Sequence, residues 1–140
     1  MLHRAKHKKI MPDVWMAPGG HLEFNEGLYE AARREIDEET GLKIKNMRVK
    51  AIGTAFLKDL NQELFFHFLF ADYAGGKIVQ NDHDGELVWL TPKEIAKLPT
   101  LLAEIREILP LLFKNNGKII SYKATYVKGN TMNAFELEKS

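Results

Sequence analysis

The longest hydrophobic stretch of the chain lies near its middle and predicts a pair of β-strands. One strand is expected from about Met47 to Phe56, and a second from Glu63 to Tyr73. Within the second strand, residues 64–70 (LFFHFLF) are apolar at nearly every position. A continuous apolar run of this kind is typical of a strand that is buried on both faces.

Further strands are expected later in the chain. Leu87 to Leu90 is a short apolar run, and residues 119–127 and 131–137 are two longer strand patterns. The last two are joined through Lys128-Gly129-Asn130, which is typical of a hairpin turn. Asn115-Asn116-Gly117 predicts another turn before them.

Helical patterns separate the strands. Residues 28–40 predict a helix, in which Tyr29, Ala32 and Ile36 share an arc that would be buried against a sheet. Gly41 follows as a stop signal, because glycine readily takes the left-handed conformation after the last helical turn.

Two more helices are predicted after residue 90. The segment Thr91-Pro92-Lys93-Glu94 is a capping box with proline at the first helical position, and it predicts a short helix. Thr100 is expected to cap a second helix that continues to about Phe113, with Pro110 bending or shortening its last turns. Trp15 and Trp89 are expected to be packing anchors.

This mixture of strands and helices predicts the α+β class. The 140 residues are enough for a single domain, expected to span residues 1–140. The apolar fraction of 45% and the charged fraction of 28% are ordinary for a globular chain. A net charge of +1 argues against a polyanion-binding surface, so nucleic acid is not the expected partner.

Two absences in the sequence narrow the classes of function. The chain has no cysteine, which excludes disulfides, thiolate zinc sites and thiol nucleophiles. It has no apolar run of transmembrane length and no signal-peptide pattern, so a membrane is not an expected partner and a cytoplasmic location is the default expectation.

The chemistry of the chain is concentrated between Gly20 and Leu42, in GHLEFNEGLYEAARREIDEETGL. Glu35, Glu38 and Glu39 are spaced i, i+3 and i+4, so their carboxylates fall within about 100° of one helical face. Like charges at this spacing destabilise an isolated helix, and hard divalent cations prefer oxygen ligands. The pattern therefore predicts a metal site.

The glycines before the helix agree with this prediction. Gly20 follows Gly19, so the backbone can approach a metal or a phosphate without a side chain in the way. A loop, a helix and a second loop would present the carboxylates at fixed spacing, which suits metal-assisted attack of water on phosphorus.

The same segment resembles the Nudix box, the signature of hydrolases that act on nucleoside diphosphates linked to another group. All nine specified positions match: Gly20, five residues, Glu26, seven residues, Arg34, Glu35, Ile36, one residue, Glu38, Glu39, one residue, Gly41 and Leu42. The lead-in Pro18-Gly19-Gly20 also resembles the family's approach to the box. The resemblance implies an α/β/α sandwich with a mixed sheet.

The resemblance also implies roles for the box residues. Mg²⁺, with Mn²⁺ as an alternative, would be bound by Glu35, Glu38 and Glu39 together with the carbonyl oxygen of Gly20. One carboxylate would act as general base, and Glu38 and Glu39 are the candidates within the box.

Other residues would complete the site. Glu26 and Arg34 would brace it through ion pairing and hydrogen bonds. A further acidic ligand often follows the box in sequence. Glu86 is the candidate taken here, and Asp84 remains open beside it.

The C-terminal part is similar to the oxidised-purine nucleoside triphosphatase branch of the family. That branch often carries an acidic pair early in its last helix, where this chain has Leu102, Glu104 and Ile105. The doublet is absent, and Glu104 is the candidate contact to a base.

Three more residues are candidate substrate contacts. Arg4, in a basic cluster that would otherwise be a solvated edge strand, and His21, in the box loop, are candidates for phosphate. Phe56 is a candidate for stacking on a base.

The N-terminus departs from the family pattern. Nudix proteins usually have a strand before the segment that resembles residues 1–4. Either the full protein is longer, or the sheet lacks its first strand. A missing strand would leave an unpaired edge, from which a homodimer is hypothesised.

The leading hypothesis is a Mg²⁺-dependent pyrophosphohydrolase. Its substrate would be a nucleoside triphosphate, ordinary or oxidised, converted to the monophosphate and pyrophosphate. Nucleotide sugars, dinucleoside polyphosphates and RNA ends remain open as substrates. The alternative class is a module that binds or senses a nucleotide without cleaving it.

Overall fold

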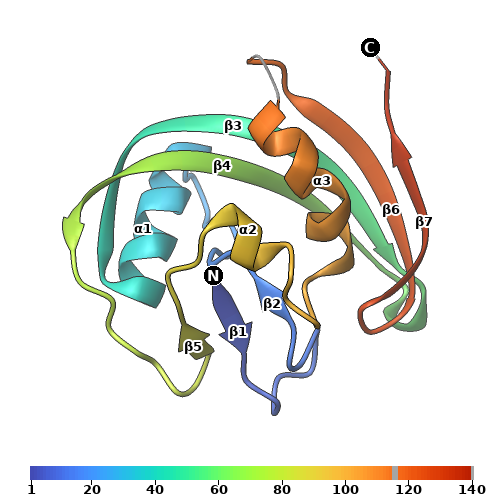
Figure 1. The fold of residues 1–140 in the computed structure, drawn as a ribbon, viewed down its shortest axis with the longest axis horizontal. Helices are drawn as coiled ribbons and strands as arrows, with labels where there is room; N and C mark the ends of the chain where they lie inside the picture. The colour runs from blue at the N-terminus through green and yellow to red at the C-terminus, as the bar shows by residue number, and fades with distance from the viewer. Residues whose placement is uncertain (115–116, 140) are drawn as a thin grey trace.

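Two β-sheets form the framework of the protein (Figure 1). The computed structural model describes residues 1–114 and 117–139, so Asn115 and Asn116 of the predicted turn lie outside the described residues. The larger sheet contains, in spatial order, β4 (Gln62–Gly76), β3 (Leu42–Leu57), β6 (Ile120–Lys128) and β7 (Thr131–Leu137). β3 is antiparallel to β4 and parallel to β6, which makes this sheet mixed.

The smaller sheet is antiparallel, and the helices lie around the two sheets. Its order is β2 (Trp15–Met16), β1 (Leu2–Arg4) and β5 (Gly85–Leu87). The helices are α1 (Leu28–Thr40), α2 (Pro92–Ile95) and α3 (Ala103–Lys114), and a 3₁₀ turn, η1 (Lys58–Leu60), joins β3 to β4. The predicted α+β class and mixed sheet are confirmed.

β3 and β4 are longer than the hydrophobic pattern predicted. β3 begins directly after Gly41 and runs for 16 residues, and β4 runs for 15. Their pairing shifts register between Lys45 and Arg48 and again between Val49 and Ala51. Irregularities of this kind bend a strand, and in Figure 1 both strands curve over α1.

The smaller sheet corrects two expectations. β1 pairs with β2 on one side and with β5 on the other, so residues 2–4 are not an edge strand. The edge proposed for a homodimer is therefore not at β1. The strand predicted at 87–90 lies earlier, at 85–87, because its backbone pairs with residues 2–4.

The two later helices agree in part with the sequence pattern. The capping box is confirmed, since the Thr91 amide donates to Glu94 Oε2 at 2.7 Å and the Glu94 amide donates to Thr91 Oγ1 at 3.3 Å. α3 begins at Ala103, two residues later than a cap at Thr100 would place it. The Trp15 amide donates to the Thr100 carbonyl, and the Leu102 amide donates to the Trp15 carbonyl, both at 2.9 Å. These two bonds form an isolated parallel bridge between Leu101 and Trp15 of β2, which precedes the first turn of α3.

The main core lies around β3, β6 and α3. Its buried members are Met11, Val14, Ala51, Ala55, Leu57, Leu101, Leu102, Ile105, Ile108, Leu112, Tyr122, Ala124 and Tyr126. Two expected core residues lie elsewhere, since Tyr29 is 44% exposed and Trp89 is 67% exposed. Within residues 1–114 and 117–139, no helix has the length and apolar character needed to cross a membrane.

One carboxyl group is buried in this core. Glu104, at the start of α3, is 1% exposed. The Tyr122 hydroxyl donates to Glu104 Oε2, and the Tyr126 hydroxyl lies 3.4 Å from Glu104 Oε1. The Glu104 amide also donates to the Tyr126 hydroxyl, at 3.1 Å. These bonds tie α3 to β6.

Gly53 allows Tyr122 to occupy its position. A Cβ at Gly53 would lie 2.2 Å from Cζ of Tyr122, and Tyr122 is itself stacked on Phe135. We expect Gly53→Ala to destabilise the protein by about 1–3 kcal/mol, as overpacking of a tight core does. Urea denaturation measures this cost.

The matched comparison is the same glycine change in a Tyr122→Leu background. Removing the ring should remove most of the cost of Gly53→Ala, which a double-mutant cycle detects. An equal cost in both backgrounds would show that Tyr122 does not require the glycine.

Glu104 gives a second prediction, on pH. Burial, opposed by the tyrosine hydrogen bonds, raises the pKa of the Glu104 carboxyl above its usual value. The folded state therefore keeps the proton to higher pH than the unfolded state does, and this contribution to stability falls as pH rises above about 4.5. Glu104→Gln removes the titration, so the stability of this variant relative to wild type should rise between pH 5 and pH 8. A difference that does not change with pH would contradict this prediction.

Candidate functional site

The ends of α1 fix the position of the box helix. Gly27 is the N-cap residue, and its amide donates to Glu30 Oε2 at 2.8 Å. At the other end, Gly41 takes a φ of 73°, and its amide donates to the Asp37 carbonyl at 2.8 Å. A side chain on Gly41 would be strained and would meet the Lys77 carbonyl at 2.7 Å. The glycine therefore sets the point at which α1 turns into β3.

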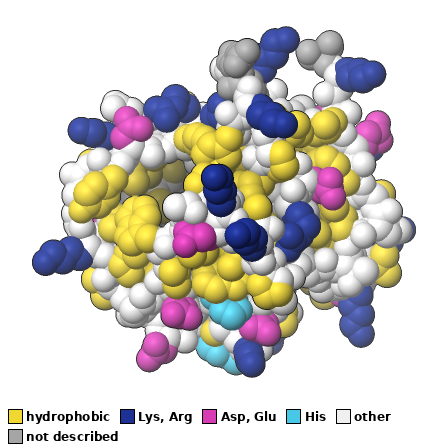
Figure 2. Space-filling model, in the orientation of Figure 1, with side chains coloured by type: hydrophobic (Ala, Val, Ile, Leu, Met, Phe, Trp, Pro, Cys, Tyr) yellow, Lys and Arg dark blue, Asp and Glu magenta, His cyan; other side chains and the backbone are white. Residues whose placement is uncertain are grey.

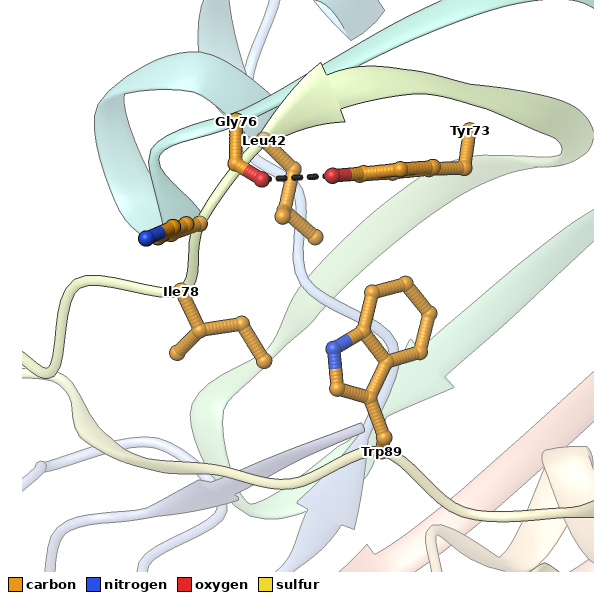
Figure 3. Close-up of a pocket in the computed structure, with 6 residues that line it drawn as sticks. Leu42, Tyr73, Gly76, Ile78 and Trp89 are labelled. Carbon is orange, nitrogen blue, oxygen red and sulfur yellow. Dashed lines mark hydrogen bonds between the residues drawn. The ribbon is translucent and has the colours of Figure 1, made fainter.

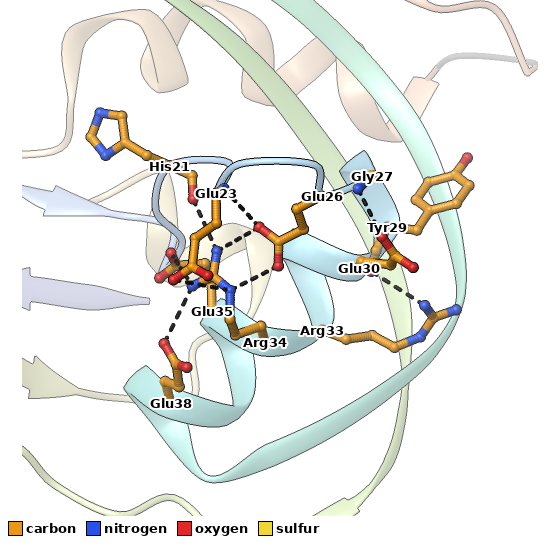
Figure 4. A network of polar contacts seen from close by, with 10 residues as sticks. All are labelled: His21, Glu23, Glu26, Gly27, Tyr29, Glu30, Arg33, Arg34, Glu35 and Glu38. Atoms are coloured by element: carbon orange, nitrogen blue, oxygen red, sulfur yellow. Dashed lines mark hydrogen bonds and ion pairs between the residues drawn. The ribbon is translucent and has the colours of Figure 1, made fainter.

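Arg34 is the centre of the polar network around α1 (Figure 4). Its Nε and Nη2 each donate to a different oxygen of Glu26 at 2.8 Å, which makes a bidentate pair. Its Nη1 donates to Glu35 at 2.7 Å and to Glu38 at 3.3 Å. Nη2 also donates to the His21 carbonyl at 3.0 Å. One guanidinium thus connects the box loop to the carboxylate face of the helix.

This network changes the acidity of its members. The hydrogen bond from Arg34 is the main cause that lowers the pKa of Glu26 to about 2. The same pair raises the pKa of Arg34 above its ordinary value. Glu26 and Arg34 therefore remain charged at any working pH, which agrees with the bracing role predicted for them.

Glu35 and Glu39 lie against the two glycines before the box loop. A Cβ at Gly20 would lie 2.3 Å from the Glu35 carboxyl, so this carboxyl group lies directly against the glycine backbone. The Gly19 amide donates to Glu39 Oε2 at 2.7 Å. The structure therefore brings Gly20, Glu35 and Glu39 together.

The environment of Glu39 disfavours the negative charge of its carboxylate. Burial, the largest influence, raises the pKa of Glu39, and the hydrogen bond from Gly19 opposes it. The negative charges of Glu35 and Asp84 raise the pKa further, while the positive charge of Arg4 lowers it. A cation beside Glu39 would relieve this unfavourable environment.

The other two predicted ligands are more exposed to solvent. The Glu38 side chain is 61% exposed and faces Arg34. Glu86 is exposed in β5, opposite His3 of β1. Among residues 1–114 and 117–139, no three acidic, histidine or cysteine side chains already lie in an arrangement that would hold a metal ion. Glu35 and Glu38 are instead turned toward Arg34.

Asp84 is the acidic residue that the structure associates with the box. Its negative charge raises the pKa of Glu39. It also accepts a hydrogen bond from Lys8 Nζ at 2.7 Å. This bond from Lys8 is the main cause that lowers the pKa of Asp84. The pairing of Lys8, one residue of the basic N-terminal cluster, with Asp84 was not predicted, because the two residues are far apart in sequence.

The four predicted substrate residues are placed differently from one another. Arg4 lies in β1, and its positive charge lowers the pKa of Glu39. Its Nε donates to the Ile10 carbonyl at 3.2 Å. His21 contributes its carbonyl to Arg34, and Figure 4 shows its ring directed away from the carboxylates. Phe56 lies near the far end of β3, opposite Glu63, and is 36% exposed.

The fourth, Glu104, is not a surface residue. Its carboxyl group is buried in the core and is hydrogen-bonded by the tyrosines of β6. The predicted contact between Glu104 and a nucleotide base is not compatible with this burial, because no ligand reaches a carboxyl group enclosed by packed side chains.

The comparisons with known proteins agree with the geometry. The family model described as NUDIX domain matches residues 1–112. The uncharacterized Nudix hydrolase YvcI of Bacillus subtilis is 31% identical over 107 residues, which are 74% of this chain and 66% of that protein. An 8-oxo-dGTP diphosphatase of Buchnera aphidicola is 38% identical over 72 residues, which are 51% of this chain and 53% of that protein.

A solved structure extends the likeness to the fold. The crystal structure of a MutT protein from Bacillus halodurans superimposes with a TM-score of 0.81 at 24% sequence identity, covering 98% of this chain and 87% of that one. The chain spans no more than about two thirds of the length of the two sequence relatives described above. Because the NUDIX domain model matches more than half of the chain, the chain belongs to the Nudix family.

Proposed function

We propose that this protein is a divalent-metal-dependent pyrophosphohydrolase that acts on a nucleoside diphosphate-linked substrate. The best candidate is a nucleoside triphosphate, ordinary or oxidised, cleaved to the monophosphate and pyrophosphate. The observation that carries the proposal is the box helix, on which Glu35 and Glu39 lie against Gly20 and Gly19 beside Arg34.

The residues of the box fit a hard divalent cation. Carboxylate and carbonyl oxygens are the ligands that Mg²⁺ prefers. Glu35, Glu38 and Glu39 would bind Mg²⁺ or Mn²⁺ with the Gly20 carbonyl, and Asp84 or Glu86 would add a further oxygen. When bound, the metal would neutralise phosphate charge and lower the pKa of the attacking water.

The chain's own residues have separate tasks in this proposal. Hydrolysis requires a group that takes a proton from the attacking water, and a base is most effective when its pKa is close to the working pH. Glu39 is the first candidate for this role, because its carboxyl group lies against Gly19 at the centre of the box. Glu38 remains the second candidate for the base.

Glu26 and Arg34 would hold the box loop and the neighbouring carboxylates in place. The bidentate pair between them anchors the box loop, and Arg34 also holds the carboxylates of Glu35 and Glu38. Arg4 would attract the substrate phosphates, since its positive charge lies close enough to the box to lower the pKa of Glu39.

Glu39→Gln tests the proposal. Glutamine keeps the size of the side chain and can still accept from the Gly19 amide, but it cannot take the proton. We expect kcat to fall by at least about 100-fold, with the melting temperature almost unchanged. The measurement is phosphate release in the presence of Mg²⁺ over ordinary and oxidised purine triphosphates, nucleotide sugars and dinucleoside polyphosphates.

Asp37→Asn is the matched control. Asp37 is on the same helix but pairs with Lys43 rather than with the box carboxylates. This variant should keep close to the wild-type rate. A Glu39→Gln protein as active as wild type would refute the role of Glu39, and a wild type without turnover on any substrate would favour a nucleotide-binding module.

Removal of the metal is a separate test. Chelation with EDTA should abolish turnover by the wild type, and added Mg²⁺ or Mn²⁺ should restore it. Turnover that continues in excess EDTA would contradict a metal-dependent reaction.

A further inference from the structure

β4 forms one edge of the larger sheet, and its outer side is unpaired. The strand pairs with β3 on its inner side. Within residues 1–114 and 117–139, no backbone hydrogen bond joins residues 62–76 to a segment other than β3. The amide and carbonyl groups along the outer side of β4 therefore form a template on which another strand can pair.

The two ends of β4 have different surroundings. Near the C-terminal end, the ring centroids of Tyr73 and Trp89 are 6.3 Å apart, and the Tyr73 hydroxyl donates to the Gly76 carbonyl at 2.6 Å (Figure 3). Over residues 62–68, the aromatic pairs found in the described part of the chain lie within β4 itself. The N-terminal half of the strand is thus the more open half of the edge.

Residues 62–68 are also the regular part of β4. They pair one to one with residues 51–57 of β3, whereas the register shifts in the rest of the pairing. Phe65 is the middle residue of this segment and lies opposite Thr54. Its side chain is 63% exposed, so the centre of the segment presents an aromatic ring to solvent.

The inward-facing side chains of this segment are incompletely covered. Leu64 and Phe68 pack against the core but are only partly buried. Ala55 and Ala51, which lie opposite them on β3, are 1% and 0% exposed. A strand added at the edge would remove part of this apolar surface from water, in addition to pairing the free backbone groups.

The segment lacks the residues that commonly protect an edge strand. Residues 62–68 contain no lysine, arginine or proline. Lys and Arg side chains gather instead over α2, near the centre of the face shown in Figure 2. Like charges would oppose contact between two copies through that face, and no such charge opposes contact through residues 62–68.

We propose that two copies of the chain form a dimer by antiparallel pairing of residues 62–68 of β4, with a two-fold axis at Phe65. Opposite residues of an antiparallel pair lie on the same face of the sheet. This axis therefore places Phe65 against the partner's Phe65 and Glu63 against the partner's His67. The two four-stranded sheets would become one continuous sheet.

The charges of the segment select this register and a second copy as the occupant. The pairing of Glu63 with His67 occurs twice across the axis, and opposite charges favour such cross-strand pairs. Moving the axis to Phe66 would place Glu63 against an apolar leucine instead. The axis at Phe65 is also the midpoint of the regular segment, so the whole of residues 62–68 can pair. An interface of this self-complementary kind closes as a dimer.

Sedimentation equilibrium tests the dimer. One short strand pair is a small interface, so the average mass of the wild type should rise from that of one chain toward that of two as the concentration increases. Phe65→Lys should keep the mass of one chain throughout, because lysine at an edge opposes pairing. Leu137→Lys is the matched control, since Leu137 is 46% exposed on β7, at the opposite edge of the sheet. This control should dimerise as the wild type does.

Cross-linking tests the register. The chain has no cysteine, so Phe65→Cys carries one thiol per copy. Opposite residues of an antiparallel pair have Cβ atoms about 4.5–5.5 Å apart, close to the separation in a disulfide. Mild oxidation should therefore convert Phe65→Cys into a covalent dimer. Glu63→Cys and His67→Cys should cross-link far less, because neither residue lies opposite its own copy.

An exchange of charge tests the pairing of Glu63 with His67. His67→Glu would place two carboxylates opposite each other and should weaken the dimer by about tenfold. Adding Glu63→Lys to this variant should restore the affinity to within about threefold of wild type, because lysine then lies opposite the new glutamate. The melting temperature of each variant, measured at a concentration where the wild type is monomeric, should stay close to the wild-type value.

Four results would overturn the proposal. The first is a wild-type protein that keeps the mass of one chain at every concentration. The second is a dimer that persists in Phe65→Lys, and the third is a dimer lost in Leu137→Lys, which would assign the interface to β7. The fourth is efficient cross-linking of His67→Cys but not of Phe65→Cys, which would contradict the two-fold axis at Phe65.

Discussion

Arg34 lies where the negative charge of the chain is most concentrated, and its guanidinium links the parts of the site. The side chain is only 20% exposed and meets the carboxylates of Glu26, Glu35 and Glu38 and the carbonyl of His21. Carboxylates this close together repel one another unless a positive charge lies between them. Lysine could not replace Arg34, because the bidentate pair with Glu26 requires the planar fork of a guanidinium.

The scaffold supports this arrangement through short local signals and a curved sheet. Gly27 and Gly41 set the ends of α1, and β3 begins directly after Gly41. On one side of α1 lie the carboxylates, and on the adjacent side lie Ile36 and Thr40, which line an apolar hollow together with Leu42 and Trp89.

Features encoded by neighbouring residues were predictable from the sequence. The box helix, the pairing of Glu26 with Arg34 and the capping box at Thr91 depend on residues within ten positions of one another. The N-terminal extension of β3 was not predicted, although residues 42–45 alternate in polarity in the way that is typical of a half-buried strand.

Features that depend on distant residues were not predictable. Glu104 is buried because Tyr122 and Tyr126, on a strand far along the chain, surround its carboxyl group. Asp84 rather than Glu86 is coupled to the box because Lys8 and β1 bring it there. Trp89, expected to be a packing anchor, is 67% exposed, and no local pattern in the sequence distinguishes a buried tryptophan from an exposed one.

The most direct test of the box as a cation site is Mn²⁺ binding followed by electron paramagnetic resonance. Addition of wild-type protein with a nucleotide should reduce the signal of free Mn²⁺, because the carboxylates on α1 hold the ion. A Glu35→Gln, Glu39→Gln double variant should leave most of the signal unchanged while it remains folded. Equal loss of free Mn²⁺ with both proteins would show that the metal binds elsewhere and would contradict the assignment of the site.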